Sequence, residues 1–483
     1  MPTARGGSQT GRHCLTTSLE LFATTAFIAV MSAVVASVLG YPVGMWLASL
    51  RRGRRLLTSV LLVPFILPAF LVGVSLRPLA GDLLDSSLFA LVALIGAHAL
   101  MNAGFLAVVA ASSLAPRDQC EAAALDGASE ARIRRDIHLP QQLPALSAAA
   151  LLVALYSATS FGLVITLGQG SIRTLETEIV TEALQRLDLA AASVLAILQT
   201  LLTLGFFLLA RRLGATPTAL FGEGPPASHP SRLGAVLGLG LVVSILWILG
   251  GVIYRALTVG PGWWGNLANL AGRGARDLLN LSVIEATGNS VRNLVVATVI
   301  SLALAWWLSH TRVGLAVLIP IGLSPVVLGL GALVISGYLP PGIAASWLLL
   351  PLVQVIFLTP LAFQILSPAR KSLSSDLLDA ARLDGANGLQ RWFLIEAPVL
   401  RQPLVVAGSL VSLASLGEFG AARFLTYGSD QTLPLVMFRL MSRPGPENLG
   451  MAMTAATIFI LLAVVVVWLI SSTRQDRIGE ELR

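Results

Sequence analysis

The chain alternates between long apolar runs and short polar segments along nearly its whole length. Because unpaired backbone amides are costly in lipid and the runs lack the alternation of barrel strands, each run is predicted to be a helix. The pattern therefore predicts an all-α, polytopic transmembrane protein. Eleven runs are long enough for a hydrocarbon core about 30 Å thick, at 20–49, 56–76, 87–113, 145–167, 189–210, 234–255, 289–309, 313–337, 343–366, 403–425 and 447–471.

A polar segment that follows the third run recurs after the ninth. The first copy, EAAALDGASEARIRRDIHLP, ends at Pro140, and the second, DAARLDGANGLQRWFLIEAP, ends at Pro398, so the offset is 398 minus 140, or 258 residues. The same offset relates Phe161 to Phe419. An imperfect motif seldom recurs in register with its flanks by chance. Six runs separate the copies, an even number, so both segments lie on one side of the membrane and the repeat is parallel.

Each copy carries an acidic residue, two alanines, a glycine, an isoleucine and a proline at fixed spacing. This pattern resembles the EAA loop of ABC-importer permeases of the binding-protein-dependent, methionine-permease-like family, in the fused two-copy type. The resemblance implies the type I importer permease fold, in which each loop docks into one subunit of an ATPase dimer. The matching residues are Glu121, Ala122, Ala123, Gly127, Ile137 and Pro140 in the first EAA segment (121–140), and Asp379, Ala380, Ala381, Gly385, Ile395 and Pro398 in the second (379–398).

Composition supports a membrane protein and gives it an orientation. The chain has 55% hydrophobic and 12% charged residues and a mean hydropathy of +0.81, whereas a soluble domain has about twice that charged fraction. With both EAA segments in the cytoplasm, the inner segments hold 20 of the 32 lysine and arginine residues, as the positive-inside rule expects. The net charge of +7 thus reflects topology in a plasma membrane and not a nucleic-acid partner.

The repeat divides the chain into 1–213, a first permease repeat, 214–232, a cytoplasmic linker, and 233–483, a second permease repeat. The linker is rich in Pro, Gly and Ser and is predicted to be a flexible connector. The run at 234–255 has no partner in the first repeat, which predicts an external N-terminus. Related fused permeases usually begin with one more helix, so this chain has lost it or its true start lies upstream.

Motifs for catalysis, metal binding and nucleotide binding are missing from the sequence. A P-loop needs a lysine after its glycines, and the single lysine, Lys371, has no such context. The five histidines have no metal-site spacing, and Cys14 and Cys120 lie far apart. We therefore expect no enzymatic activity, metal or cofactor in this chain, with ATP bound by a separate ATPase subunit.

Polar residues inside the predicted spans are costly and therefore informative. His98 and Asn102 lie one turn apart on one face, and this pair resembles a pattern in permeases for thiamine and ferric iron. A hydrogen-bonded pair that joins helices is favoured over a substrate contact. Glu418 either attracts a cationic substrate or pairs with Arg423.

The cargo is predicted by resemblance only. The stretch from Ser160, SFGLVITLGQGSIRTLETEIV, resembles the first half of thiamine permeases, and the fused organisation is typical of thiamine and ferric-iron importers. We expect thiamine or a related small organic cation, delivered by an external binding protein, with ferric iron as the alternative and a sulfate- or molybdate-like anion third. A secondary transporter or a scaffold would need no ATPase and no paired EAA segments.

Overall fold

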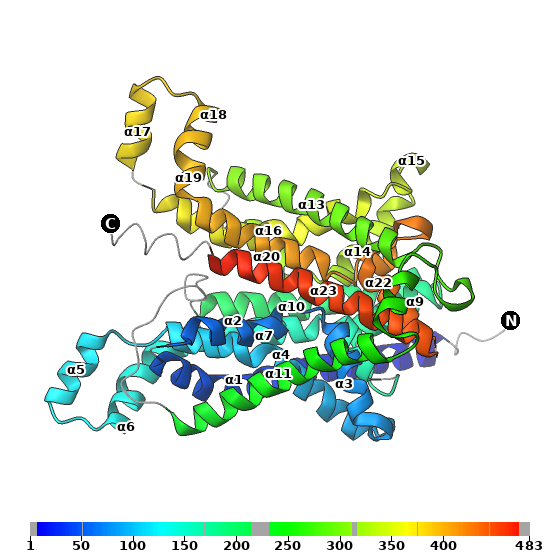
Figure 1. Ribbon diagram of the computed structural model, residues 1–483, viewed down its shortest axis with the longest axis horizontal. Coiled ribbons are helices and arrows are strands. Elements are labelled where there is room, and N and C mark those ends of the chain that lie inside the picture. Colours follow the sequence, from blue (N-terminus) through cyan, green and yellow to red (C-terminus); the bar gives the residue numbers. More distant parts are fainter. Residues whose placement is uncertain are drawn as a thin grey trace. The chain divides into compact units, whose positions relative to one another are not determined.

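The computed structural model describes residues 7–50, 52–168, 170–213, 231–311, 316–373, 375–443 and 445–472 (Figure 1). Regular secondary structure in these ranges is entirely helical, as the sequence predicts. The chain divides by its contacts into two compact units, Met1–Ile248 and Leu249–Arg483, so that α11 (Arg232–Thr258) is shared between them. The predicted linker, 214–232, lies almost wholly outside the described residues, and the predicted boundary at 233 stays a prediction.

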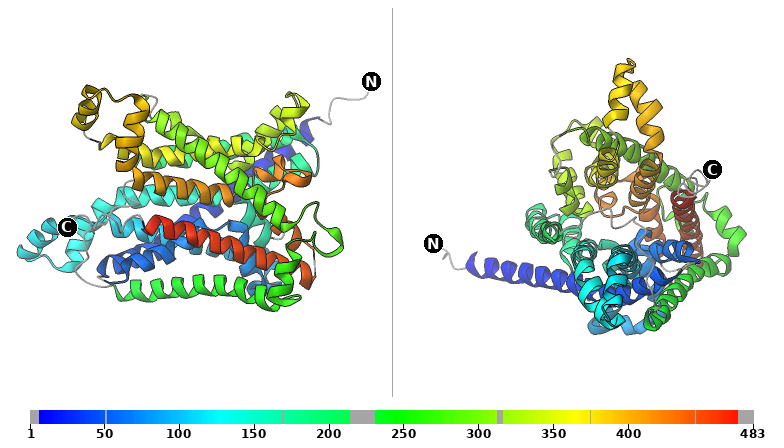
Figure 2. Two further views of the ribbon diagram at one scale, coloured as in Figure 1. Left: turned by 45° about the horizontal axis from the view of Figure 1, so that its top comes forward. Right: turned by 90° about the vertical axis from the view of Figure 1, so that its left-hand side faces the viewer.

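The first unit contains a long α1 and a series of helices that end in α10 (Figure 2). Their bounds are α1 (Gly7–Ser49), α2 (Arg54–Ile66), α3 (Ala69–Ala80), α4 (Ser87–Ser112), α5 (Arg117–Leu125), α6 (Glu130–Ile133), a π-helical turn (Arg134–His138), α7 (Leu139–Ala158), α8 (Phe161–Leu167), α9 (Leu175–Leu184) and α10 (Leu189–Arg212).

The second unit repeats this order at nearly the same offset. It contains α12 (Gly262–Asn269), α13 (Val283–Leu308), a 3-10 turn (Ala316–Gly322), α14 (Pro325–Ser336), α15 (Pro341–Ala344), α16 (Leu349–Lys371), α17 (Ser375–Leu383), α18 (Gly388–Arg391), a π-helical turn (Trp392–Glu396), α19 (Ala397–Val399), α20 (Arg401–Leu416), α21 (Ala422–Leu425), α22 (Leu433–Met441) and α23 (Pro446–Ser472). The bounds of α17 and α18 match those of α5 and α6 residue for residue once the repeat offset is removed.

The predicted spans are present, but several are broken. Among the described residues, eight helices are long and apolar enough to cross a membrane, and the number rises to eleven if each of three bent pairs is one span. The predicted span at 56–76 bends by 88° between α2 and α3, where Pro68 follows the end of α2. The predicted span at 313–337 bends by 99° before α14. Proline removes a backbone donor and restricts the residue before it, which favours such breaks.

Two glycines allow α1 and α4 to pack closely in the first unit. A Cβ at Gly44 would lie 2.5 Å from the carbonyl oxygen of Ala107, and one at Gly40 would lie 2.7 Å from that of Ala103. These glycines are one turn apart, so a single face of α1 is bare of side chains where α4 crosses it. Small residues at this spacing permit close backbone contact between helices in lipid.

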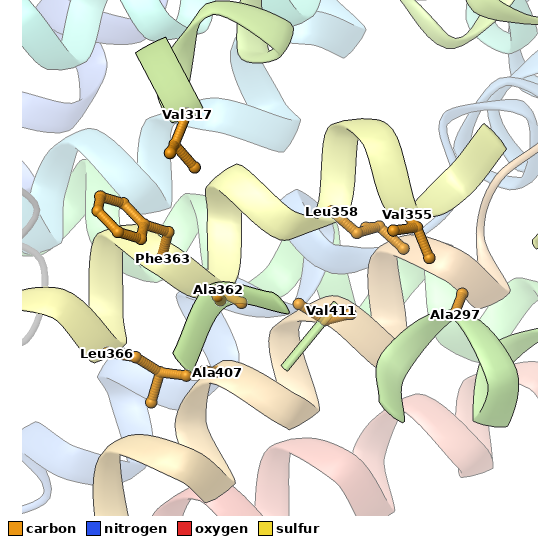
Figure 3. Close-up of a cluster of buried hydrophobic side chains, with 10 residues drawn as sticks. Ala297, Val317, Val355, Leu358, Ala362, Phe363, Leu366, Ala407 and Val411 are labelled. Carbon is orange, nitrogen blue, oxygen red and sulfur yellow. The ribbon is translucent and has the colours of Figure 1, made fainter. Parts of the chain in front are cut away.

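The second unit has an apolar core formed by α13, the 3-10 turn, α16 and α20. Leu358, Ala362 and Leu366 on α16 are buried, and they lie at helical spacing on one face. Ala297 from α13 and Ala407 and Val411 from α20 pack in the same cluster (Figure 3). The second EAA segment lies in the chain between two of these packed helices, α16 and α20. Glu418 follows the end of α20.

Candidate functional site

The first EAA segment folds as a helical hairpin of α5 and α6 that projects from one end of the first unit (Figure 1). Gly127 adopts a φ of 82°, a left-handed conformation that a side chain would disfavour. The amide of Ala128 donates to the carbonyl of Ala123 at 3.0 Å, which closes the C-terminal turn of α5. Gly127 therefore terminates α5 with a tight turn.

The second EAA segment has the same construction. Gly385 has a φ of 78°, and the amide of Ala386 donates to the carbonyl of Ala381 at 3.0 Å. Asn387 and Gln390 then cap α18 reciprocally, each side-chain oxygen accepting from the other residue's backbone amide at 2.9 Å. Two hairpins with the same turn geometry thus carry the two copies of the motif.

The prolines at the ends of the segments could be expected to break a helix, but they do not interrupt one in either copy. Pro140 is the second residue of α7, which continues directly from the π-helical turn that contains Ile137. Pro398 has the same place in α19, after the turn that contains Ile395. Both prolines lie just after a π-helical turn, so the missing amide donor and the proline ring fall where the helix already departs from regular α geometry. The break in the second copy comes later, where the chain bends by 73° between Val399 and Arg401.

The motif residues on α5 and α17 are mostly at the surface. Glu121, Ala122, Asp379 and Ala380 are exposed, whereas Ala381 is buried. Each of these helices ends in an exposed leucine, Leu125 and Leu383, and both side chains are 89% exposed. Sequence reasoning missed this pair, although the two leucines stand at the repeat offset next to the motif. A large apolar side chain that is exposed at the same position of both copies is suited to contact with a partner protein.

His98 and Asn102 are both buried on α4, with 2% and 5% exposure. The Asn102 side-chain amide donates to the backbone carbonyl of His98 at 2.7 Å, one turn earlier on the same helix. This bond satisfies Asn102 within α4 and does not join two helices. The predicted role of the pair in packing between helices is not supported by this contact.

Glu418 lies just beyond the end of α20 and is 6% exposed. Its carboxylate accepts hydrogen bonds from the backbone amides of Ala421 at 2.6 Å and Ala422 at 3.1 Å. The alternative of an ion pair with Arg423 is wrong for the described structure, because the Arg423 guanidinium lies over the Phe438 ring, 5.6 Å from its centroid. Glu418 thus braces the turn that leads into α21 and keeps a carboxylate within the second unit.

Gln354 on α16 forms a second polar contact with the end of α20. The Ser415 hydroxyl donates to the Gln354 side-chain oxygen at 2.7 Å, and the Gln354 amide donates to the Ser415 carbonyl at 3.3 Å. The side chain of Gln354 is 1% exposed, so both of its ends are satisfied in a buried position. These two hydrogen bonds join α16 to the end of α20.

Residues 40–258 match the family model described as "Binding-protein-dependent transport system inner membrane component", a range that contains the first EAA segment. The relatives of the chain are likewise permease proteins of transport systems, and one of them aligns with both repeats. The chain is thus a multi-pass protein of the plasma membrane that is similar to the permeases of binding-protein-dependent ABC importers.

Individual relatives differ in how much of the chain they cover. The thiamine transport system permease protein ThiP of Brucella abortus (strain 2308) is 26% identical over 471 residues, which cover 91% of this chain and 86% of the relative. The sulfate transport system permease protein CysW of Escherichia coli (strain K12) is 28% identical over 51% of this chain and 90% of the relative. The osmoprotective compounds uptake permease protein GgtC of Synechocystis is 30% identical over 27% of this chain and 46% of its own length.

Proposed function

We propose that this permease imports thiamine or a related small organic cation. The observation that carries the proposal is the extent of the similarity to the Brucella thiamine permease, which runs through 91% of the chain and therefore through both repeats. A carboxylate buried in the second unit, Glu418, is consistent with a cationic cargo, because a buried charge favours an opposite charge nearby.

The two EAA segments are proposed to dock into a dimer of separate ATPase subunits, which bind and hydrolyse ATP. The support is geometric: both hairpins have the same left-handed glycine turn and present an acidic residue and a leucine to solvent. Glu121 and Asp379 would pair with basic residues at the rim of a groove on the ATPase, and Leu125 and Leu383 would fill apolar positions within it. An external binding protein would deliver the cargo at the opposite face.

An anion importer is the second candidate. The Escherichia coli sulfate permease matches over 51% of this chain at 28% identity, but it covers the length of about one repeat. Ferric iron remains an alternative because fused permeases resemble this chain in organisation. Both alternatives use the same docking proposal and differ only in the cargo.

The docking and cargo proposals are tested on the importer reconstituted in proteoliposomes with its ATPase and binding protein. Radiolabelled thiamine, ferric ion and sulfate are supplied in turn, and ATP-dependent uptake of thiamine alone is the expected result.

Leu125→Ser and Leu383→Ser together should reduce co-purification of the ATPase without loss of membrane insertion. Leu208→Ser, on the exposed face of α10, is the matched control for a lost apolar surface residue. Uptake of ferric ion or sulfate instead would reject the thiamine assignment, and full ATPase co-purification by the double variant would reject the docking role.

A further inference from the structure

The segment from Ser429 to Leu433 lies against the second and third turns of α13. The Asn289 side chain donates to the Ser429 carbonyl at 2.7 Å, and the backbone amide of Leu433 donates to the Ser290 hydroxyl at 2.8 Å. Arg292 completes the attachment with an ion pair to Asp430 at 3.2 Å. Residues 431 and 432 are therefore held close to the face of α13 that Ser290 occupies.

Three polar side chains around this attachment are buried and lack hydrogen-bond partners. Asn293, one turn beyond Ser290, is 2% exposed, and Gln431 and Thr432 are 1% and 4% exposed. Within the described ranges, neither amide atom of Asn293 or Gln431, nor the hydroxyl of Thr432, has a hydrogen-bond partner. A buried polar group left unpaired costs about 1–3 kcal/mol, so five such atoms together require a physical reason.

This group lies level with the polar end of α20. The Thr298 and Ser412 hydroxyls are 3.1 Å apart, and a methyl group added at Gly408 would touch Leu302, so α13 and α20 run antiparallel. Asn293 precedes Thr298 by five residues, so in antiparallel helices it lies beside the residues about five positions after Ser412. These residues form the end of α20, between Ser415 and Glu418. The unpaired amides thus share one depth of the second unit with the carboxylate of Glu418, which lies within the predicted span at 403–425.

The first repeat carries only one of these groups. At the repeat offset, Thr174 corresponds to Thr432, but Val35 stands in place of Asn293, Ser160 in place of Glu418 and Arg173 in place of Gln431. Arg173 is committed to an ion pair with Glu178. A requirement of the common fold would have kept the two carboxamides and the carboxylate in both copies, so these three groups belong to something that only the second repeat does.

We propose that Asn293, Gln431 and Thr432 form a binding site for a small polar organic molecule that carries both hydrogen-bond donors and acceptors. Each carboxamide offers two N–H donors and one acceptor oxygen, and the threonine hydroxyl can do either. Glu418 at the same depth complements a positive charge on the ligand. The proposal rests on the proposed function, because it places the cargo of the permease at a stated position in the second repeat.

The first test replaces unpaired amides by apolar side chains of the same shape, in the reconstituted importer with radiolabelled thiamine. Asn293→Leu and Gln431→Met should each raise the KM for uptake about tenfold, the loss of one or two ligand hydrogen bonds. Their thermal unfolding temperatures should not fall, because no protein hydrogen bond is lost. The matched control is Gln354→Met, which breaks two existing bonds to Ser415 and should lower that temperature. Unchanged KM in both amide variants would overturn the proposal.

The second test does not depend on the identity of the cargo. In a variant of the permease without cysteines, a cysteine at position 293 should react with a small hydrophilic methanethiosulfonate reagent, because a site for a polar ligand must admit polar molecules. The control is Ala297→Cys, one turn further on the same face of α13 and buried in the apolar cluster, which should not react. Reaction at 293 without thiamine uptake by the unaltered importer would reject the thiamine assignment and keep the site. Equal lack of reaction at both positions would reject the site.

Discussion

The backbone amide of Leu433 donates to the hydroxyl of Ser290 at 2.8 Å, and this bond ties the start of α22 to α13. In the first repeat the equivalent amide, that of Leu175, donates to Thr25 at 3.0 Å and not to Ser32, the counterpart of Ser290. Both bonds satisfy the first amide of a helix, which has no partner within that helix. The two copies reach the same attachment with hydroxyls placed two helical turns apart.

This difference predicts unequal effects for the same substitution at the two equivalent serines. Ser290→Ala should destabilise the permease by about 1 kcal/mol, because the Leu433 amide loses its acceptor in a buried position. Ser32→Ala should have little effect, since the Ser32 hydroxyl is fully buried and has no hydrogen-bond partner in the described part of the chain. Thermal unfolding in detergent measures both, and equal shifts would contradict the assignment of the two hydroxyls.

The glycines of the EAA segments should be sensitive to substitution for reasons of backbone conformation alone. A Cβ at Gly127 or Gly385 would meet no atom within 4 Å, so the cost of Gly127→Val or Gly385→Val is the left-handed φ, about 1–2 kcal/mol. We expect normal membrane insertion, weaker co-purification of the ATPase, and a larger loss in the double variant. Gly388→Ala is the control, because Gly388 has open space and begins a helix. Full transport by the double variant would exclude a coupling role.

Glu418→Gln keeps the size of the side chain but removes its charge and one acceptor oxygen. One of the amides of Ala421 and Ala422 then faces an NH₂ group, so a stability loss of about 1–3 kcal/mol is expected. Uptake of radiolabelled thiamine should fall, with assembly onto the ATPase unchanged. Glu447→Gln, an exposed carboxylate on α23, should change neither. If thiamine uptake by Glu418→Gln equals that of the unaltered permease, the charge has no part in transport.

Topology is tested by thiol labelling in intact cells. Single cysteines at Ser129 and Gly388, beside the turns of the two EAA segments, should react only with reagents that enter the cytoplasm. A cysteine at Ser171, between α8 and α9, should react with an impermeant reagent added outside. Labelling of position 129 by the impermeant reagent would reverse the orientation of the whole protein.

The natural thiol of the first EAA segment provides a pH-dependent readout. Burial raises the pKa of Cys120, and the carboxylates of Asp118 and Glu121 raise it further. Since the thiolate is the reactive form, alkylation of Cys120 at neutral pH should be slower than that of an unperturbed thiol and should accelerate as the pH rises above neutral. Glu121→Gln removes one negative charge, lowers the pKa of the thiol and should speed the reaction. An identical rate in this variant would show that the carboxylate does not act on Cys120.

The sequence was sufficient for the features that depend on apolar runs and on repetition. The helical class, the spans and the turns at Gly127 and Gly385 follow from hydropathy, offset and the conformational freedom of glycine. The breaks at Pro68 and before Arg401 were not predicted, because an apolar run has the same hydropathy whether it is straight or bent. The partners of Glu418 were also beyond the sequence. Arg423 is five residues away in the chain, but the amides of the next turn lie closer in space.

The covalent fusion of the two repeats has a consequence for how the permease can evolve. In a symmetric pair of identical subunits, any side chain introduced at one position appears twice. Here the position that holds Glu418 in one copy holds Ser160 in the other, and the position that holds Asn293 likewise holds Val35 in the other copy. A single gene with two copies can thus place a carboxylate, and a pair of carboxamides, at positions of one repeat only. The two halves of this chain therefore differ chemically at equivalent positions, which two identical subunits in a homodimer cannot do.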